Sequence, residues 1–343
     1  MSKRAFITGI TGQDGSYLAE FLLGKGYDVY GLVRRTSNNP MIRFKEPGKL
    51  EKIKIIYGNM RDSASIERAL EISKPDEIYN LAAQSDVGIS FQCPEEASEV
   101  NYYGVGRLVN EAMRVCPQAR IYQASTSEMF GRTNPPQNEG SLFQPVSPYG
   151  RAKLKAHEDY VTGYRNKHGL FICSGILFNH ESPRRGEHFV TRKITISLAK
   201  IKHGLQERFQ LGNLDAKRDW GFAKDYVEAM WRMLQEDKPD DFVIATGEMH
   251  TVREFAEEAA KFFGMDIEWG GGGLEEKGID RKTKKVVIEV NPAHLRPNEV
   301  DFLQGDSSKA ERVFGWKHKT AFKDLVRLMA EHDLEHVKRE KLL

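Results

Sequence analysis

Tyr149 and Lys153 stand four residues apart in a segment whose apolar spacing predicts a helix from Pro148 to about His168. Residues separated by four positions lie on one face of a helix, so the phenol and the ammonium would be neighbours. A phenol with a pKa of about 10 is a poor base at neutral pH, but nearby positive charge stabilises the phenolate and lowers that pKa. The pair therefore predicts a site that takes a proton from a substrate hydroxyl.

Three glycines near the N-terminus predict a dinucleotide site. Gly9, Gly12 and Gly15 lie between an apolar strand at Arg4 to Thr8 and a helical pattern at Ser16 to Leu23. Glycine permits the tight turn, lets backbone amides approach a pyrophosphate, and brings the helix close to the sheet. A purely structural turn is the alternative, but the position in the first strand–turn–helix of the chain favours the dinucleotide.

The end of the second predicted strand indicates which dinucleotide binds. Where a site for NAD usually carries an acidic residue, this chain has Arg34, Arg35, Thr36 and Ser37. Two guanidinium groups and two hydroxyls suit a 2′-phosphate, so the sequence predicts NADP; the alternative is that the arginines are merely solvated. The loop after another strand consists of Leu81, Ala82, Ala83, Gln84 and Ser85. Its small residues would let the chain pass close to the cofactor.

The elements that must position these groups alternate between strands and helices. Apolar runs at 4–8, 28–33, 53–57, 78–81, 120–124 and 171–176 are separated by helical patterns, including one at 95–115. This alternation predicts βαβ units and a Rossmann-type doubly wound parallel sheet. We expect residues 1–178 to form an NADP-binding domain, to which a segment near 215–247 returns. Residues 179–343 should form a smaller α+β substrate domain, with helices at 192–203 and 252–263 and a hairpin around 286–290.

Composition excludes several classes of protein. The chain has 343 residues, and its net charge of +2 gives no general field for nucleic acid or a membrane surface. Its three cysteines are far apart in sequence, which predicts neither a disulfide framework nor a metal site. No signal peptide or membrane span is readable, so we expect a cytoplasmic protein.

Several longer motifs extend over almost the entire chain. They are Gly9 to Gly15, Gln123 to Glu128, Ser147 to Gly150, and the more specific blocks Phe178 to Gly186, Leu211 to Gly221, Arg296-Pro297 and Glu299 to Asp301. With these motifs the sequence resembles the extended short-chain dehydrogenase/reductases, and within them the branch that dehydrates GDP-sugars. The resemblance implies a hydro-lyase that converts GDP-mannose to GDP-4-keto-6-deoxy-D-mannose, the first step toward GDP-deoxyhexoses such as GDP-fucose or GDP-rhamnose.

The resemblance also implies a role for each reacting group. Thr126 would hydrogen-bond the sugar, Tyr149 would be the base, and Lys153 would hold the nicotinamide ribose. Oxidation at C4 acidifies the C5 proton, and removing that proton while expelling the C6 hydroxyl requires a second acid/base group, which would be Glu128. Hydride then returns to C6, so the reaction has no net redox change and the cofactor can stay bound.

The same resemblance assigns the binding residues. To the cofactor it assigns, besides the residues already named, Thr11, Gln13, Asp14, Asn59, Met60, His180 and Arg185; to the GDP-sugar it assigns Ser85, Asn179, Lys193, Gly212, Arg218, Arg296 and Glu299. Two positions depart from the family pattern: Asn59 stands where an aspartate is usual near the adenine, and Glu96 replaces an aromatic residue. A homodimer or homotetramer is also implied.

Rival functions remain open at this point. A 4-epimerase or 4-keto reductase would lack a carboxylate two residues after Thr126. A dehydratase acting on dTDP-glucose or CDP-glucose shares the same logic, and relatives acting on dTDP-glucose usually carry an Asp-Glu pair where this chain has Ser127-Glu128. A non-catalytic NADP-sensing protein would be expected to have lost Tyr149 or Lys153, and both are present.

Overall fold

A seven-stranded parallel sheet forms the centre of the computed structural model, which describes residues 2–37, 39, 41–44, 48–295, 298, 300 and 302–341. Its strands are β1 (Arg4–Thr8), β2 (Asp28–Val33), β3 (Lys54–Tyr57), β4 (Glu77–Asn80), β5 (Arg120–Thr126), β6 (Ile172–Leu177) and β11 (Asp241–Ile244). Their order is β11-β6-β5-β4-β1-β2-β3, and every neighbouring pair runs parallel. The doubly wound sheet predicted from the alternating pattern is confirmed.

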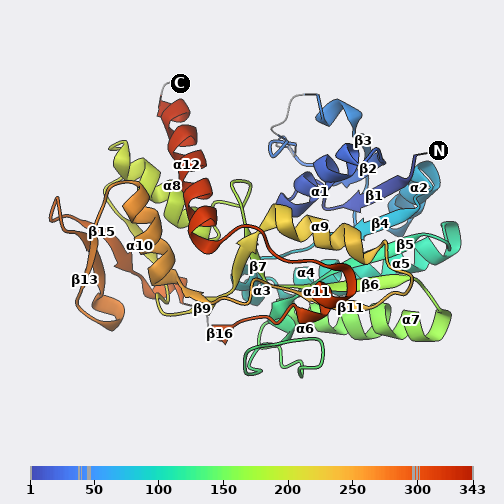
Figure 1. The fold of residues 1–343 in the computed structure, drawn as a ribbon. Coiled ribbons are helices and arrows are strands. Elements are labelled where there is room, and N and C mark those ends of the chain that lie inside the picture. Colours follow the sequence, from blue (N-terminus) through green and yellow to red (C-terminus); the bar gives the residue numbers. More distant parts are fainter. Residues whose placement is uncertain are drawn as a thin grey trace.

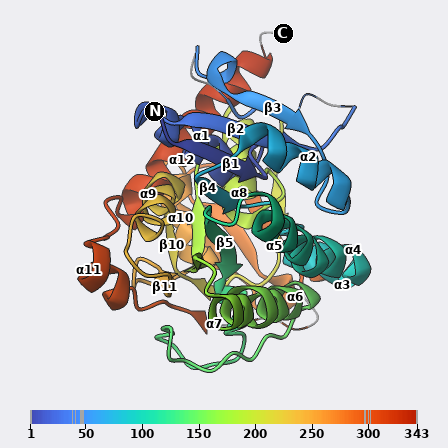
Figure 2. The same ribbon diagram turned by 90° about the vertical axis from the view of Figure 1, so that its right-hand side faces the viewer.

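Helices cover both faces of this sheet (Figures 1 and 2). One layer contains α1 (Gln13–Gly24), α9 (Ala223–Met233) and α11 (Ser308–Phe314); the other contains α2 (Ser63–Ser73), α5 (Gly104–Val115), α6 (Pro148–Ala156) and α7 (Gly163–His168). Successive strand residues face opposite sides. Ile7 of β1 thus joins the core beneath α1 and α9, whereas Phe6 joins the core beneath α2 and α5.

Two long predicted helices are present but are interrupted. The first runs through α4 (Pro94–Ser98), a π-helical stretch at Glu99–Tyr103, and α5; the second runs through α6, a π-helical stretch at His157–Thr162, and α7. A π-helical turn widens the helix locally and shifts the faces that follow it. The second interruption begins directly after the turn that carries Lys153.

The remaining elements build a smaller α+β part. It contains a four-stranded sheet of order β13-β14-β15-β8, made of β13 (Ile267–Gly270), β14 (Lys277–Asp280), β15 (Val286–Val290) and β8 (Phe209–Leu211). Helices α8 (Val190–Lys202), α10 (Val252–Phe262) and α12 (Phe322–Lys341) pack against one another beside it. The predicted hairpin is the antiparallel β14–β15 pair.

Short strands join the two parts. They are β7 (Asn179–Glu181) paired with β10 (Trp220–Phe222), and β9 (Lys217–Arg218) between β12 (His250–Thr251) and β16 (Phe302–Leu303). The chain thus passes from the large sheet through β7 into the small part, and returns to the large sheet with α9 and β11. Among the described residues, no helix is long and apolar enough to cross a membrane.

Candidate active site

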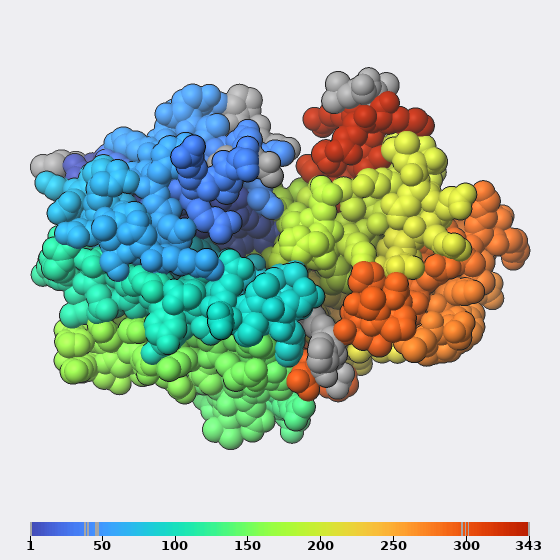
Figure 3. All heavy atoms as spheres, turned by 180° about the vertical axis from the view of Figure 1, so that it is seen from behind, coloured from blue at the N-terminus to red at the C-terminus, as the bar shows by residue number. Residues whose placement is uncertain are grey.

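A cavity of about 980 Å³ opens at the carboxyl ends of β1, β4 and β5, where the large sheet meets the α+β part. The hollow between these two parts is visible in Figure 3. Its wall includes the predicted residues Gly9, Thr11, Gly12, Gln13, Asp14, Gly15, Arg34, Asn59, Met60, Leu81, Ala82, Ala83, Gln84, Ser85, Thr126, Glu128, Tyr149, Lys153, Asn179, His180, Arg185, Lys193, Gly212 and Arg218. Groups predicted for cofactor, substrate and catalysis therefore share one space.

Five predicted residues are not placed on this wall. Arg35, Thr36 and Ser37 are exposed after β2 and do not line the cavity, unlike their neighbour Arg34. Arg296 and Glu299 lie outside the described residues.

The glycine turn has the geometry that a pyrophosphate requires. Gly9 has a φ of +66°, in the left-handed region that favours glycine. A Cβ atom on Gly15 would lie 2.3 Å from the carbonyl oxygen of Gly9, so only glycine lets α1 pack this close to the turn. No described side chain caps α1 at its N-cap residue, Gly12. The first-turn amides and the positive end of the helix dipole therefore suit an anionic ligand.

The end of the cavity beside β2 and β3 carries the two departures from the family pattern. The side-chain oxygen of Asn59 accepts the backbone N–H of Arg61 at 3.1 Å. Arg61 in turn pairs with the carboxylate of Glu96 at 3.0 Å, and Glu96 lines the cavity. The acidic residue on this wall therefore has a cationic partner of its own, while Arg34 lines the same wall.

The predicted catalytic groups meet where the start of α6 faces the end of β5. Ser147 caps α6 by accepting the N–H of Gly150 at 3.0 Å, which sets the helix so that Tyr149 and Lys153 are both buried beside the cavity. Lys153 Nζ donates a hydrogen bond to the carbonyl oxygen of Ala124 at 2.9 Å.

Thr126 and Glu128 complete this group. The Thr126 hydroxyl interacts with the phenol of Tyr149 in the direction that lowers the pKa of the phenol, and it accepts the backbone N–H of Glu128 at 3.2 Å. That second contact begins a 3₁₀ turn at Ser127–Met129, in which the side chain of Glu128 is buried on the cavity wall. A phenol, an ammonium, a hydroxyl and a carboxylate are thus collected from two adjacent elements, which is a set suited to moving protons.

Burial has the largest effect on the pKa values of Tyr149 and Lys153. It raises the pKa of Tyr149 to about 12, although the Thr126 hydrogen bond opposes the shift. It also lowers the pKa of Lys153 to about 8. The ammonium lies 5.9 Å from the centre of the Tyr149 ring and donates to Ala124 instead. Thr126 and Arg185 act to lower the pKa of the phenol, but burial outweighs them, so positive charge bound nearby would favour the phenolate further.

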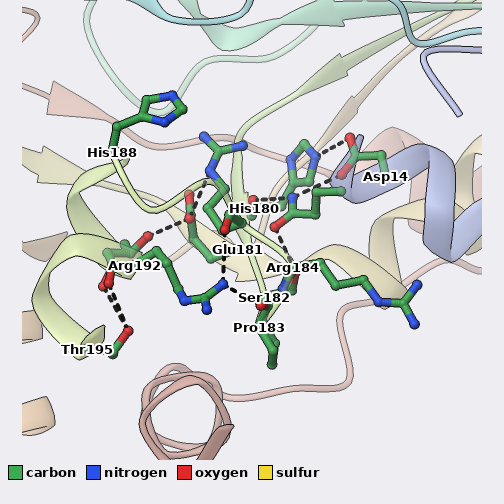
Figure 4. Close-up of polar contacts among 12 residues, drawn as sticks. Asp14, His180, Glu181, Ser182, Pro183, Arg184, His188, Arg192 and Thr195 are labelled. Atoms are coloured by element: carbon green, nitrogen blue, oxygen red, sulfur yellow. Dashed lines mark hydrogen bonds and ion pairs between the residues drawn. The ribbon is translucent and has the colours of Figure 1, made fainter. Parts of the chain in front are cut away.

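His180 joins the glycine turn to the α+β part (Figure 4). His180 Nε2 contacts Asp14 at 2.7 Å, and Nδ1 contacts the carbonyl oxygen of Phe178 at 2.7 Å. Burial by itself would lower the pKa of His180, but Asp14 and these hydrogen bonds raise it overall. Both ring nitrogens face acceptors, so a protonated ring can donate to both, and its charge would hold Asp14 in place.

The segment after β7 presents further cations to the cavity. Arg185 Nε lies 3.2 Å from the buried carboxylate of Glu181, and its guanidinium stacks 3.6 Å above the ring of Phe189. Burial lowers the pKa of Lys193, which lies 3.2 Å from His294 Nε2. The buried side-chain oxygen of Asn179 has no hydrogen-bond partner among the described residues, so it can accept a bond from a ligand.

Asp86 and His188 are among the wall residues that the predicted set did not include. His188 Nε2 lies 3.5 Å from the carboxylate of Asp86, and the pair connects the segment after β7 with the loop after β4. Asp86 also caps α3 (Val87–Gln92) by accepting the N–H of Ile89 at 3.0 Å. Asp86 directly follows the predicted loop and its capping pattern was readable; the partnership with His188 depends on the tertiary fold.

Comparisons with known proteins agree with this geometry. The sequence profile described as GDP-mannose 4,6 dehydratase matches residues 6–329. The chain is 51% identical to GDP-mannose 4,6 dehydratase 2 of Arabidopsis thaliana, over 99% of this chain and 89% of that protein. It is 52% identical to GDP-mannose 4,6 dehydratase of Homo sapiens, over 96% and 91%. Among solved structures, UDP-glucose 4-epimerase of Thermus thermophilus in complex with NAD has a TM-score of 0.79 at 25% identity, covering 96% of this chain and 98% of that one.

Proposed function

Because the chain belongs to the GDP-mannose 4,6-dehydratase family, we propose that the cavity converts GDP-mannose to GDP-4-keto-6-deoxy-D-mannose and water. The protein is a hydro-lyase whose substrate is a nucleotide sugar. The observation that carries the proposal is the buried carboxylate of Glu128 on the same wall as Tyr149 and Lys153. A tyrosine and a lysine suffice for oxidation, whereas elimination of water needs this additional acid/base group.

The cofactor is a nicotinamide dinucleotide, and we propose NADP. The glycine turn and the uncapped start of α1 suit its pyrophosphate. Arg34 lines the cavity after β2, where the 2′-phosphate of an adenine ribose would lie, and a guanidinium binds phosphate strongly. The exposed Arg35, Thr36 and Ser37 would act only as secondary contacts from the same loop.

Each reacting group has one task in this proposal. Tyr149 takes the proton of the C4 hydroxyl, Thr126 orients that hydroxyl and the phenol, and the buried ammonium of Lys153 holds the nicotinamide ribose. Glu128 removes the C5 proton and delivers a proton to the departing C6 hydroxyl, and a proton returns to C5 at the end. A bound nicotinamide cofactor would supply the hydride acceptor for C4 and the hydride donor for C6, and its positive charge would favour the phenolate of Tyr149.

The α+β part would recognise the nucleotide. Lys193 and Arg218 supply positive charge for the diphosphate, Asn179 offers its unpartnered oxygen, and Gly212 borders the same wall. Residues 1–178, joined by a segment near 215–247, would then form the cofactor domain, and most of 179–343 the substrate domain. Arg296 and Glu299, outside the described residues, are proposed for the substrate by resemblance alone, as is a homodimer or homotetramer.

A mass measurement tests the function. The protein is incubated with GDP-mannose and NADP without added reductant, and the nucleotide sugar is analysed by mass spectrometry. We expect a product lighter by one water and no accumulation of NADPH. Glu128→Gln should reduce this conversion at least about 100-fold, as expected for loss of a general acid/base group.

A matched variant controls for loss of charge alone. Glu71 lies on the exposed face of α2, and Glu71→Gln should leave the rate unchanged. Absence of the dehydrated product with wild-type protein would refute the proposal. Net formation of NADPH would indicate an ordinary dehydrogenase instead.

A further inference from the structure

A buried hydrogen-bonded chain leads away from the catalytic end of β5. The Ser174 hydroxyl donates to the Ser125 hydroxyl at 2.7 Å, and His157 Nδ1 lies 3.2 Å from Ser174 Oγ. All three side chains are buried, with exposed fractions of 7% or less. On the far side of the ring, His157 Nε2 lies 3.7 Å from Asp241, which also binds Arg165. None of the catalytic roles described above uses His157.

The position of His157 relates it to the catalytic pair. Tyr149, Lys153 and His157 follow one another at intervals of four residues, so they form a stripe facing the sheet. Lys153 is tied to β5 through Ala124, and His157 is tied through Ser174 to Ser125, the next residue along that strand. The helix and β5 are therefore linked by hydrogen bonds at two successive residues of the strand, Ala124 and Ser125.

These two hydrogen-bonded links restrain the position of the helix along its axis, which apolar packing alone does only weakly. Around them the helix meets the sheet through apolar side chains such as Ala156 and Val161. Apolar burial is non-directional and restrains sliding of a helix along its axis only weakly. Two hydrogen bonds at fixed points do restrain it, and the same short stretch of β5 ends in Thr126, whose hydroxyl contacts Tyr149.

The hydrogen bonds also identify Nδ1 as the nitrogen of His157 that contacts Ser174. A serine hydroxyl has one proton, and that of Ser174 is donated to Ser125. With that direction Nδ1 donates to Ser174, and with both hydroxyls reversed Ser174 donates to Nδ1, so the contact is a hydrogen bond for either ring tautomer. Burial lowers the pKa of His157, with Asp241 and Glu158 opposing and Arg165 adding to the shift.

We propose that His157 is a positioning residue: through Ser174 and Ser125 it sets the end of β5 against α6, and so places Lys153 and Thr126 around Tyr149. The inference rests on the proposed function of those three residues. It assigns the action to Nδ1 and to the contact with Ser174, not to the ring volume or to Asp241. The effect should therefore follow the presence of a group at the Nδ1 position that can hydrogen-bond Ser174.

Paired variants separate these contributions. In His157→Asn the amide nitrogen can occupy the place of Nδ1, whereas in His157→Gln the longer side chain reaches the place of Nε2. We expect His157→Gln and Ser174→Ala each to lower kcat/KM about tenfold, the amount given by loss of one buried hydrogen bond. His157→Asn should stay within about threefold of wild type. The double variant His157→Gln/Ser174→Ala should lower kcat/KM no more than either single change, because both changes break the same hydrogen-bonded chain.

A second measurement keeps the inference testable apart from the reaction. NADPH binding is followed by its fluorescence, and the dissociation constant should rise in His157→Gln and Ser174→Ala but not in His157→Asn, because Lys153 would be misplaced in the first two. Thermal denaturation of all variants serves as the check on folding. If His157→Gln does not fold, Ser174→Ala, which removes only a hydroxyl, carries the test.

Two outcomes would overturn the inference. One is wild-type kinetics and NADPH affinity in both His157→Gln and Ser174→Ala. The other is equal loss in His157→Asn and His157→Gln, which would show that ring packing matters and not the Nδ1 contact. If wild-type protein does not dehydrate GDP-mannose, the proposed function fails, and the NADPH affinities alone then decide the inference.

Discussion

Replacing Lys153 with methionine should make the protein more stable at neutral pH while it removes activity. Burial lowers the pKa of Lys153 from 10.5 to about 8. At about 1.4 kcal/mol per pKa unit, the folded state carries a penalty of about 3 kcal/mol for holding the ammonium. Methionine avoids that penalty but loses the charged hydrogen bond to Ala124, which contributes about 2 kcal/mol. The net gain expected for Lys153→Met at pH 7 is therefore about 1 kcal/mol.

The pH dependence of this difference is the sharper part of the prediction. Because the pKa of Lys153 is lower in the folded state, the unfolded chain binds more protons between about pH 8 and pH 10.5, and wild-type stability rises with pH in that window relative to the variant. The advantage of Lys153→Met should shrink by about 2 kcal/mol between pH 7 and pH 10 and change sign. Groups common to both proteins cancel in the difference.

Urea denaturation followed by tryptophan fluorescence at pH 7, 8, 9 and 10 measures this difference. Lys155→Met is the matched control, since Lys155 is exposed two residues further along α6 and its loss should give no such trend. A stability difference between Lys153→Met and wild type that stays constant from pH 7 to pH 10 would refute the assignment of a strongly lowered lysine pKa. The dehydratase assay, run in parallel, should show loss of activity in Lys153→Met but not in Lys155→Met.

Two further predictions concern charges outside the catalytic group. Arg184→Met should lower the free energy of unfolding by about 3–5 kcal/mol in urea denaturation, because it leaves the buried carboxylate of Glu20 without the guanidinium that binds it at 2.8 and 2.9 Å. Adding Glu20→Met should restore much of that loss, and a double variant as unstable as Arg184→Met would contradict the pairing. Arg34→Ser should raise the dissociation constant for NADP about 30-fold in calorimetry, as expected for loss of a charged contact to phosphate, and should change the dissociation constant for NAD less than about threefold. Equal changes for the two cofactors would assign Arg34 another role.

The parts of the fold that sequence predicts well are those defined by local patterns. The strands at 4–8 and 28–33 match their predicted bounds, because apolar runs and turn residues mark both ends. The glycine turn is equally local, since Gly9 and Gly15 are required by contacts within one strand–turn–helix unit. That Tyr149 and Lys153 share one helix face follows from their spacing, and the glycine turn and the strand end at Thr126 gave that pair its weight.

The features that the sequence did not predict depend on contacts between segments that are distant along the chain. Lys153 donates to Ala124, so the pair does not lower the phenol pKa as simple adjacency predicts. Arg34 and Arg35 are both exposed after β2, but only Arg34 lines the cavity, a difference that the sequence does not reveal. Helix α12 was not predicted although its buried positions, Leu325, Met329 and Val337 among them, have helical spacing; its many charged residues obscured that pattern.

Buried ion pairs at the junction of the two parts explain how distant segments are brought into register. Arg184 binds Glu20 of α1, and Arg192 binds Asp333 of α12 at 2.7 Å, so one segment is tied to both parts of the molecule. Such pairs add little net stability, because desolvation offsets their attraction, but breaking one is costly and they accept only a narrow geometry. We interpret them as setting the position of His180, and with it the glycine turn, relative to the cations of the α+β part. A net charge of +2 gives no sign of this, because the charges that matter are paired in place.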